Sequence, residues 1–325
     1  MKNTVGLKKI LDKFSKLKIL VIGDLILDEF LWGDVSRISP EAPVPVVWVR
    51  SESFMPGGAA NVANNINAIG ATVYLAGVIG NDERGRILKE QLKEKGMKTE
   101  GLFSDDTRPT TLKTRVIAHH QQVVRIDKEE MNELKRSLID KIIGYTKQII
   151  DEIDGIIIED YGKGVITPRL LREVLKVAKA HKKIVTVDPK EEHFSYYKGV
   201  TSITPNHLEA SKFTGIKFKD DRTLLRIGKA LMVKLGCESV LITLGENGMQ
   251  LFEKGDKITY IPTVAQDVFD VSGAGDTVIG IFTLALASGA KKIAAARLAN
   301  IAAGIVVGKV GIGVVTQEEI LSGIR

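Results

Sequence analysis

The sequence predicts an α/β fold, a doubly wound and mostly parallel sheet flanked by helices, with a small β-sheet lid. Six short apolar runs are continuous rather than alternating, as expected for strands buried on both faces; they are 18–24, 72–80, 155–162, 183–189, 202–206 and 239–245. Apolar residues recur at helical spacing between these runs, over 85–96, 168–183 and 223–236. Alternating strands and helices predict right-handed crossovers, and ligands then collect at the carboxyl ends of the strands.

Two segments interrupt this alternation. Residues 31–50 and 111–126 are rich in β-forming residues but too short to form a domain of their own. We expect them to be strands of the lid, within one domain that covers residues 1–325. Apolar residues from 44 to 49 occupy both faces of the expected strand. Such a sheet needs two coverings, a ligand with the main domain on one face and a second subunit on the other.

Composition excludes several classes of protein. The chain has 325 residues, of which 44% are hydrophobic and 26% charged, with one cysteine, so disorder and a disulfide scaffold are excluded. Its 46 basic and 40 acidic residues are mixed along the chain, which argues against a nucleic-acid partner. No apolar run is long enough for a membrane span, and the first twenty residues lack a cleavable leader pattern. We expect a cytoplasmic protein.

A turn of small residues near the C-terminus is the first candidate site. Gly273, Ala274 and Gly275 directly precede an apolar helical run, so backbone N–H groups there can bind a phosphate at the positive end of the helix dipole. Asp276 follows in the first helical turn. We expect the dipole to hold its carboxylate ionised beside the phosphate, which is the position of a base in phosphoryl transfer. The alternative is a helix cap whose glycines serve only close packing.

A second glycine-rich turn lies nearer the N-terminus. Gly57 and Gly58 precede a helical pattern that is unusually dense in asparagine. Asn61 falls in its first turn and can offer a hydrogen-bond donor and an acceptor to a sugar hydroxyl. The other asparagines are equally well explained as a solvated polar face.

Together the two turns resemble the ribokinase-like (PfkB) family of sugar kinases, in which Gly-Gly-x-x-Asn binds the sugar and Gly-Ala-Gly-Asp performs the transfer. The resemblance extends over essentially the whole chain. Asp24 ends the first strand where that family places a sugar ligand. Residues 204–210 are similar to its Asn-x-x-Glu element, and 243–249 to its nucleotide-side Thr-x-Gly-x-x-Gly.

This resemblance implies a ribokinase-like fold, ATP and Mg²⁺. It assigns Mg²⁺ to Glu209 and Asn206, acting through water, and the nucleotide phosphates to Thr243, Gly245 and Gly248. The adenine is expected near a helix that contains Asn300, Ala303 and Gly304. The roles expected for Gly273, Ala274, Gly275 and Asp276 are those argued above.

Within the family, three stretches resemble the heptose 7-phosphate kinases of ADP-heptose synthesis, namely 23–47, 121–129 and 160–167. The five histidines do not form the His-x-Gly-His motif of the nucleotidyltransferase fused to many of those kinases. The resemblance therefore implies only the ATP-dependent phosphorylation of D-glycero-β-D-manno-heptose 7-phosphate at its anomeric hydroxyl. The two apolar faces of the lid separately predict a homodimer joined through the lid sheets. Another sugar or phosphosugar kinase, and a non-catalytic sugar- or nucleotide-binding regulator, stay open.

A phosphorylated sugar also needs cations that a neutral sugar does not. Lys163 follows a strand end among glycines, and Arg115 and Arg125 belong to the expected lid. We expect Asp24 and Asp28 to bind sugar hydroxyls at the other end of the substrate, although Asp28 also fits a helix or loop cap. His119 and His120 are expected in a lid strand, on opposite faces.

Overall fold

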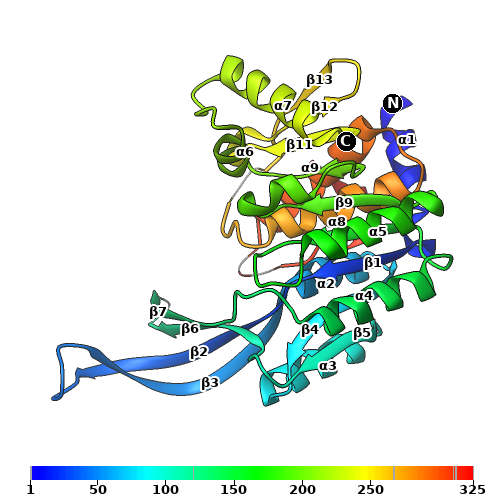
Figure 1. The fold of residues 1–325 in the computed structure, drawn as a ribbon. Coiled ribbons are helices and arrows are strands. Elements are labelled where there is room, and N and C mark those ends of the chain that lie inside the picture. The colour runs from blue at the N-terminus through cyan, green and yellow to red at the C-terminus, as the bar shows by residue number, and fades with distance from the viewer. Residues whose placement is uncertain (1, 120, 266–267, 310, 312, 325) are drawn as a thin grey trace.

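A nine-stranded sheet with helices on both faces carries the site (Figure 1). The structure is a computed structural model, and it describes residues 2–119, 121–265, 268–309, 311 and 313–324. The strand order is β13-β12-β11-β10-β9-β8-β1-β4-β5. The strands are β1 (Lys18–Gly23), β4 (Thr72–Gly80), β5 (Lys98–Asp105), β8 (Gly155–Glu159), β9 (Ile184–Asp188), β10 (Ser202–Ile203), β11 (Ser239–Thr243), β12 (Met249–Glu253) and β13 (Lys257–Ile261). All neighbours from β11 to β5 are parallel, while β12 and β13 continue the sheet antiparallel.

The helices form one layer on each face of the sheet. They are α1 (Lys2–Leu11), α2 (Ala59–Ala68), α3 (Glu83–Glu94), α4 (Arg136–Ile149), α5 (Pro168–Ala180), α6 (His207–Thr214), α7 (Asp221–Leu235), α8 (Ala274–Ala287), α9 (Lys292–Val306) and α10 (Gln317–Gly323). Alternate residues of β1 belong to different cores: Val21 lies in the core that includes residues of α2, α8 and α9, whereas Ile22 lies in the core that includes residues of α4, α5 and α7. This two-sided burial explains why β1 is apolar at every inner position. None of the helices in the described ranges is long and apolar enough to cross a membrane.

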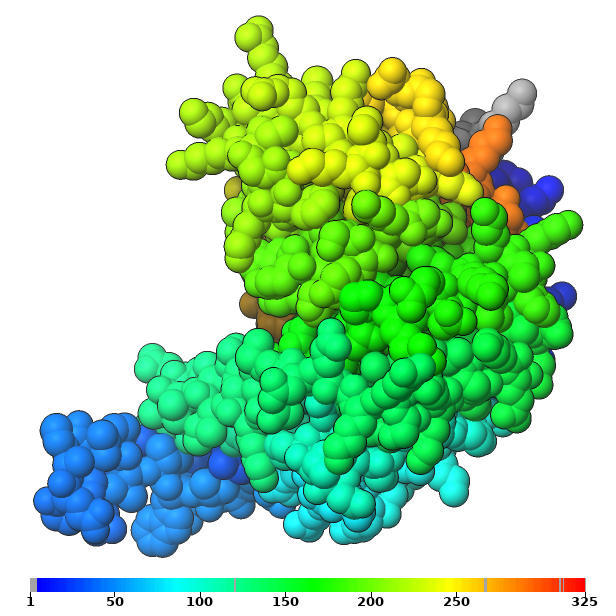
Figure 2. Space-filling view, in the orientation of Figure 1, coloured from blue at the N-terminus to red at the C-terminus, as the bar shows by residue number. Residues whose placement is uncertain are grey.

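A separate four-stranded sheet projects from the main body as an arm (Figures 1 and 2). Its order is β3-β2-β6-β7, with β2 (Leu25–Ile38), β3 (Pro45–Gly58), β6 (Thr111–Ala118) and β7 (Gln121–Lys128). These strands are longer than the predicted lid segments, because β2 begins one residue after β1 ends and β3 runs into the Gly57–Gly58 turn. The arm therefore starts directly at the candidate sugar site.

Two local predictions were wrong. His119 is not in a strand: it has φ +49° in the turn between β6 and β7, where its Nε2 lies 3.1 Å from the Val35 carbonyl oxygen. His120 lies outside the described residues. The strand expected over 202–206 is only Ser202–Ile203, because Asn206 caps the next helix.

Candidate active site

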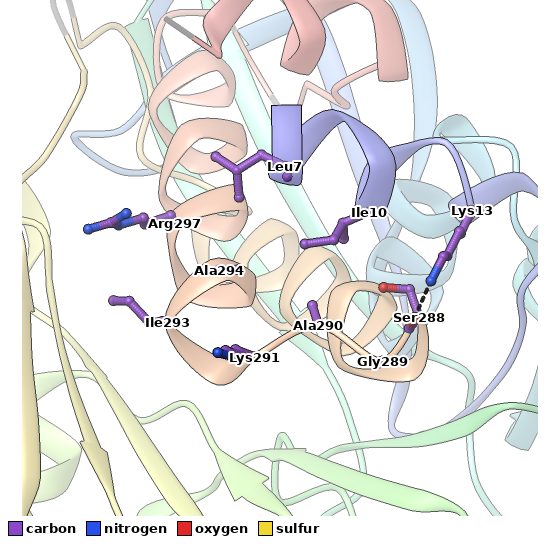
Figure 3. Close-up of a pocket in the computed structure, with 11 residues that line it drawn as sticks. Leu7, Ile10, Lys13, Ser288, Gly289, Ala290, Lys291, Ile293, Ala294 and Arg297 are labelled. Carbon is purple, nitrogen blue, oxygen red and sulfur yellow. Dashed lines mark hydrogen bonds between the residues drawn. The ribbon is translucent and has the colours of Figure 1, made fainter. Parts of the chain in front are cut away.

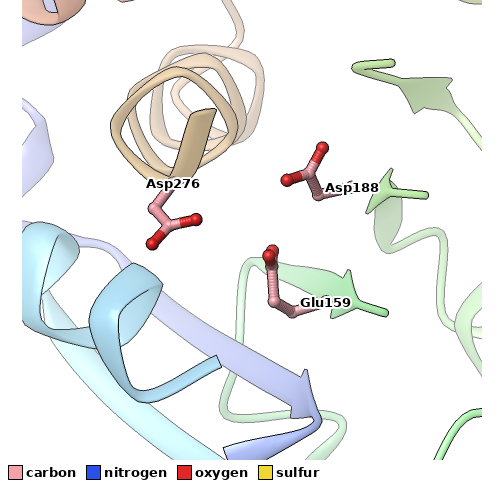
Figure 4. A group of neighbouring side chains, drawn as sticks. All are labelled: Glu159, Asp188 and Asp276. Carbon is pink, nitrogen blue, oxygen red and sulfur yellow. The ribbon is translucent and has the colours of Figure 1, made fainter. Parts of the chain in front are cut away.

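Three carboxylates converge at the carboxyl end of the main sheet (Figure 4). Glu159 ends β8, Asp188 ends β9, and the two residues are partners in the parallel ladder. Asp276 reaches them from the first turn of α8. One oxygen of each side chain lies within 4.8 Å of the others. Asp276 was predicted from the sequence, whereas Glu159 and Asp188 were not, although both lie near the carboxyl end of a predicted strand, which is where ligand-binding residues of this fold class collect.

The electrostatics of this cluster differ from what the helix dipole alone suggests. Burial raises the pKa of Asp276 to about 6, and Asp28 adds to that rise, while hydrogen bonds from Asn61 and Tyr161 oppose it. Burial and the neighbouring carboxylates also raise the pKa values of Glu159 and Asp188. Desolvation therefore affects the pKa of Asp276 more strongly than the favourable helix dipole does. The carboxylate is ionised only above about pH 6.

The small-residue turn adopts the conformation that its glycines permit. Gly273 has φ +78° and is the N-cap of α8, a backbone region that glycine enters at little cost. Gly275 is exposed, and a Cβ added there would lie 3.8 Å from Asp188 Oδ2. The Ala274 amide already donates to the Val271 carbonyl at 3.3 Å. The accessible helix start thus faces the carboxylate cluster.

Asn61 joins the two glycine-rich turns. Its Nδ2 donates to Asp276 Oδ2, so the donor expected for a sugar hydroxyl is engaged. Its Oδ1 is buried and has no partner among the described residues. A buried acceptor without a donor is costly, and a sugar hydroxyl would satisfy it.

Close backbone packing explains the glycines before α2. A Cβ on Gly57 would lie 2.2 Å from Asp28 Oδ2, and one on Gly58, whose φ is +54°, would lie 2.5 Å from the Asp24 carbonyl oxygen. Asp28 sits on β2 and accepts a hydrogen bond from Arg115, so the alternative that it caps a helix or loop is wrong. Gly57 leaves room for that carboxylate at the sugar site.

Asp24, which is predicted to bind the sugar, also has a structural role. Its carboxylate accepts three backbone amides of the loop after β8, from Tyr161 at 2.9 Å, Lys163 at 3.0 Å and Val165 at 3.1 Å. Burial raises its pKa to about 6. Asp24 therefore fixes the loop that carries Tyr161, whose hydroxyl donates to Asp276 Oδ1 at 3.2 Å. Tyr161 is a further site residue that the sequence analysis did not select.

The three predicted phosphate-binding cations have different surroundings. Lys163 Nζ lies 2.6 Å from Glu129 Oε1. Arg115 pairs with Asp28 and stacks on Phe30, with its Cζ 5.3 Å from the ring centroid. Arg125 pairs with Asp127 at 2.9 Å and its side chain is 50% exposed. All three cations are thus paired with a carboxylate, and their roles toward a substrate phosphate stay predictions.

The residues expected beside the nucleotide phosphates lie at the ends of β10 and β11. Asn206 and Glu209 form a capping box at the start of α6, and Asn206 bridges to Thr243. Gly245 has φ +60°. Gly248 has φ +82°, and a Cβ there would lie 2.2 Å from the Ile261 carbonyl oxygen. The roles of these five residues toward ATP stay predictions, while the capping box gives Asn206 and Glu209 a structural function.

The expected adenine-side residues lie on α9. Asn300 is buried and its Nδ2 donates to the Pro262 carbonyl at 2.7 Å. A Cβ on Gly304 would lie 2.9 Å from Val264 Cγ2, and Ala303 is half-buried one residue before it. These residues hold the segment after β13 against α9, and residues 266 and 267 of that segment lie outside the described part. An adenine role for Asn300, Ala303 and Gly304 stays a prediction.

The carboxylate cluster fits a divalent cation. Both oxygens of Glu159 are buried and neither has a hydrogen-bond partner within the described ranges. Three carboxylates in this space repel one another unless protons or a cation neutralise them, and carboxylate oxygens are the ligands that Mg²⁺ prefers. Glu209 also acts on this group, since its charge raises the pKa of Asp188. Mg²⁺ binding is therefore compatible with Glu159 and Asp188, together with the predicted Glu209.

A separate hollow of about 310 Å³ lies at the opposite end of α8 (Figure 3). It is formed by α1 and the turn between α8 and α9, with Leu7, Ile10, Lys13 and Arg297 in its wall. Because α8 has 14 residues, the hollow is about 20 Å from Asp276 along the helix. It does not belong to the candidate active site.

Comparison with known proteins agrees with this architecture. Residues 16–319 match the family model described as pfkB family carbohydrate kinase. The chain therefore belongs to the pfkB family of carbohydrate kinases. Phosphofructokinase-2 from Escherichia coli, crystallised with potassium, superimposes with a TM-score of 0.77 at 18% identity, covering 95% of this chain and 98% of that one. Arabidopsis thaliana ribokinase complexed with ribose and ATP gives 0.75 at 20% identity, covering 95% and 99%. At these identities the likeness shows the fold alone.

A relative in sequence is more specific. The chain is 48% identical over 307 residues to the bifunctional protein HldE of Desulfatibacillum aliphaticivorans. That alignment covers 94% of this chain and 63% of the relative. The chain thus spans less than two thirds of the length of this relative.

Proposed function

We propose that this carbohydrate kinase uses ATP and Mg²⁺ to phosphorylate D-glycero-β-D-manno-heptose 7-phosphate at its anomeric hydroxyl. The product would be the 1,7-bisphosphate of ADP-heptose synthesis, which supplies the lipopolysaccharide core. The observation that carries the kinase reaction is the buried Asp276 at the start of α8, hydrogen-bonded to Asn61 of the other glycine-rich turn. The sugar assignment is supported by the 48% identity to HldE.

Asp276 acts as the proton acceptor in this proposal. The anomeric oxygen forms a bond to the γ-phosphorus of ATP, the bond from that phosphorus to the bridging oxygen of ADP breaks, and the hydroxyl proton passes to the Asp276 carboxylate. A pKa of about 6 leaves the group ionised at neutral pH yet basic enough to take a proton. Asn61 and Tyr161 orient the carboxylate through hydrogen bonds to its two oxygens.

The remaining residues align the reactants and neutralise charge. Asp28 accepts hydrogen bonds from sugar hydroxyls, as does Asn61 Oδ1, which has no partner among the residues that the structure describes. Amides at the start of α8 face the transferred phosphoryl group. When bound, Mg²⁺ neutralises phosphate charge, and Glu159, Asp188 and Glu209 are the groups that would hold it. Because phosphoryl transfer has a loose transition state, alignment and charge stabilisation supply most of the catalysis.

The lid surface supports a second copy of the chain as a partner. Trp48, Val49 and Ile126 are large apolar residues of the lid with exposed fractions of 65%, 46% and 55%, and exposed apolar surface of this kind favours a protein partner. A homodimer joined through the lid sheets would cover it. Use of ATP and a phosphorylated sugar fits a cytoplasmic location.

Sedimentation of the wild type and of Trp48→Glu tests the dimer. The wild type should sediment as a dimer and Trp48→Glu as a monomer, and a monomeric wild type would contradict the proposal.

An ADP-release assay tests the reaction. Heptose 7-phosphate should support ADP formation far better than ribose or fructose 6-phosphate, and ³¹P NMR should detect a new anomeric phosphate. A preference for either other sugar would overturn the substrate assignment. Binding of sugar and ATP by calorimetry without turnover would instead indicate a non-catalytic regulator.

A further inference from the structure

Two lysines from different parts of the chain share one carboxylate beside the candidate sugar site. Lys163 Nζ, in the loop after β8, lies 2.6 Å from Glu129 Oε1, and Lys113 Nζ, on β6, lies 3.8 Å from Glu129 Oε2. The Lys113 ammonium is also 3.4 Å from Asp127 Oδ2. The side chains of Lys163, Lys113 and Glu129 are only 11%, 17% and 20% exposed. Glu129 therefore bridges the lid and the main body.

This bridge leaves part of the hydrogen-bonding capacity of Glu129 unused. Glu129 Oε2 is buried and has no hydrogen-bond partner in the described part of the chain. Glu129 is the only carboxylate that both ammonium groups share among the described residues, since Asp127 pairs with Lys113 but not with Lys163. A phosphate monoester carries close to two negative charges and offers three oxygens. A phosphate would satisfy both lysines better than Glu129 does.

The backbone connects both lysines to the candidate sugar ligands. Lys113 is the cross-strand partner of Asp28 in the parallel β2–β6 ladder, so their side chains leave the lid on the same face. The Lys163 amide donates to Asp24 Oδ2 at 3.0 Å. The lysine pair thus borders the sugar-binding carboxylates without being neutralised by them.

We propose that Lys113 and Lys163 together bind the distal phosphate of the sugar, and that Glu129 holds the two ammonium groups in place until the phosphate replaces it. The proposal deepens the function given above and rests on it for the nature of the substrate. It prefers Lys113 to Arg125, whose side chain is 50% exposed, and it leaves Arg115 to orient Asp28, with which Arg115 pairs.

The variants Lys113→Met, Glu129→Gln and Lys128→Met test this site. Lys128 is an exposed lysine on β7, adjacent to Asp127 and on the opposite face of the lid, and it serves as the control. Lys113→Met should raise KM for the phosphorylated sugar about 10- to 100-fold, the effect of one lost charge-assisted hydrogen bond. In Lys113→Met, KM for the same sugar without its phosphate and KM for ATP should change less than about 2-fold. In Lys128→Met, all three KM values should change less than about 2-fold.

Glu129→Gln tests whether the Glu129 carboxylate only occupies the phosphate position before the sugar binds or is also needed when the phosphate is bound. If Glu129 only occupies the phosphate position, its neutralisation should lower KM for the phosphorylated sugar. A rise in KM would show that the carboxylate is needed in the bound state, and it would overturn the replacement step. Lys113→Arg should recover most of the lost affinity, and melting curves of all variants check that they are folded.

Direct titration with inorganic phosphate, followed by calorimetry without ATP, makes the test independent of the reaction. Phosphate should bind the wild type and Lys128→Met but bind Lys113→Met at least about 10-fold more weakly. Equal binding by all three proteins would overturn the lysine site even if heptose 7-phosphate is the substrate. Loss of phosphate binding in Lys113→Met, combined with no turnover of any sugar, would keep the site and refute the proposed function.

Discussion

Asn61 donates a hydrogen bond to Asp276 across 215 positions of sequence, and it thereby joins the two glycine-rich turns at one carboxylate. The contact favours the ionised form of Asp276 and opposes the desolvation that raises its pKa. It also leaves Asn61 Oδ1 buried and without a partner among the described residues, beside the proton acceptor. One side chain thus tunes the base and presents an acceptor to the sugar.

The pH dependence of kcat/KM should follow the ionisation of Asp276. Its pKa is raised to about 6, so protonation below that pH removes the proton acceptor, and the rate should rise with pH up to about 6 and then level off. Asp24 titrates in the same range, which should steepen the acid limb. Sugar-dependent ADP release measured from about pH 5 to 8 checks this. A rate that does not change over that range would exclude Asp276 as the base.

Tyr161→Phe should move the acid limb to higher pH. The Tyr161 hydroxyl donates to Asp276 Oδ1, and its loss removes an interaction that lowers the Asp276 pKa. Tyr260→Phe provides the control, because the exposed Tyr260 hydroxyl donates to the Asn247 carbonyl. Superimposable pH profiles of Tyr161→Phe and wild type would refute the coupling.

Gly57→Ala should weaken sugar binding without changing any charge. The added Cβ would lie 2.2 Å from Asp28 Oδ2, so the carboxylate must move, and KM for the sugar should rise about 10-fold or more, as for loss of a charged hydrogen bond. Gly144→Ala is the matched control, since a Cβ there meets no atom within 4 Å. Similar KM values in the two variants would argue against Asp28 as a sugar ligand.

Glu159→Gln should reduce the dependence of stability on pH and on Mg²⁺. The folded-state pKa of Glu159 is raised, so its stabilising contribution is present below the unfolded pKa and is lost as pH rises through the folded value. Replacement by Gln removes that loss and should stabilise the protein at pH 8 by about 1–3 kcal/mol, the usual cost of a buried group without a partner.

Thermal unfolding with and without Mg²⁺ measures both effects. Added Mg²⁺ should raise the Tm of the wild type and of Glu100→Gln, an exposed strand residue, more than that of Glu159→Gln. An equal Mg²⁺ response in all three proteins would place the metal away from Glu159.

Patterns within short stretches of the sequence were enough to predict much of this fold. The apolar runs predicted β1, β4, β8, β9 and β11 because each is buried on both faces, and the two glycine-rich turns located Asn61 and Asp276. The partners of these residues could not be predicted in the same way. Glu159 and Asp188 meet because β8 and β9 are neighbours in the sheet. Lys113 lies near Glu129 because β6 pairs with β7, which ends one residue before Glu129. Such contacts depend on strand order and register, which a local pattern does not encode.

The most direct test of the central claim is ADP release with heptose 7-phosphate by the wild type, Asp276→Asn and Asp221→Asn. Asp221 is an exposed aspartate in the first turn of α7 and controls for the substitution itself. Loss of the proton acceptor should lower kcat about 10²- to 10⁴-fold in Asp276→Asn, with little change in KM for ATP, while Asp221→Asn stays at the wild-type rate. Undiminished turnover in Asp276→Asn would contradict the account.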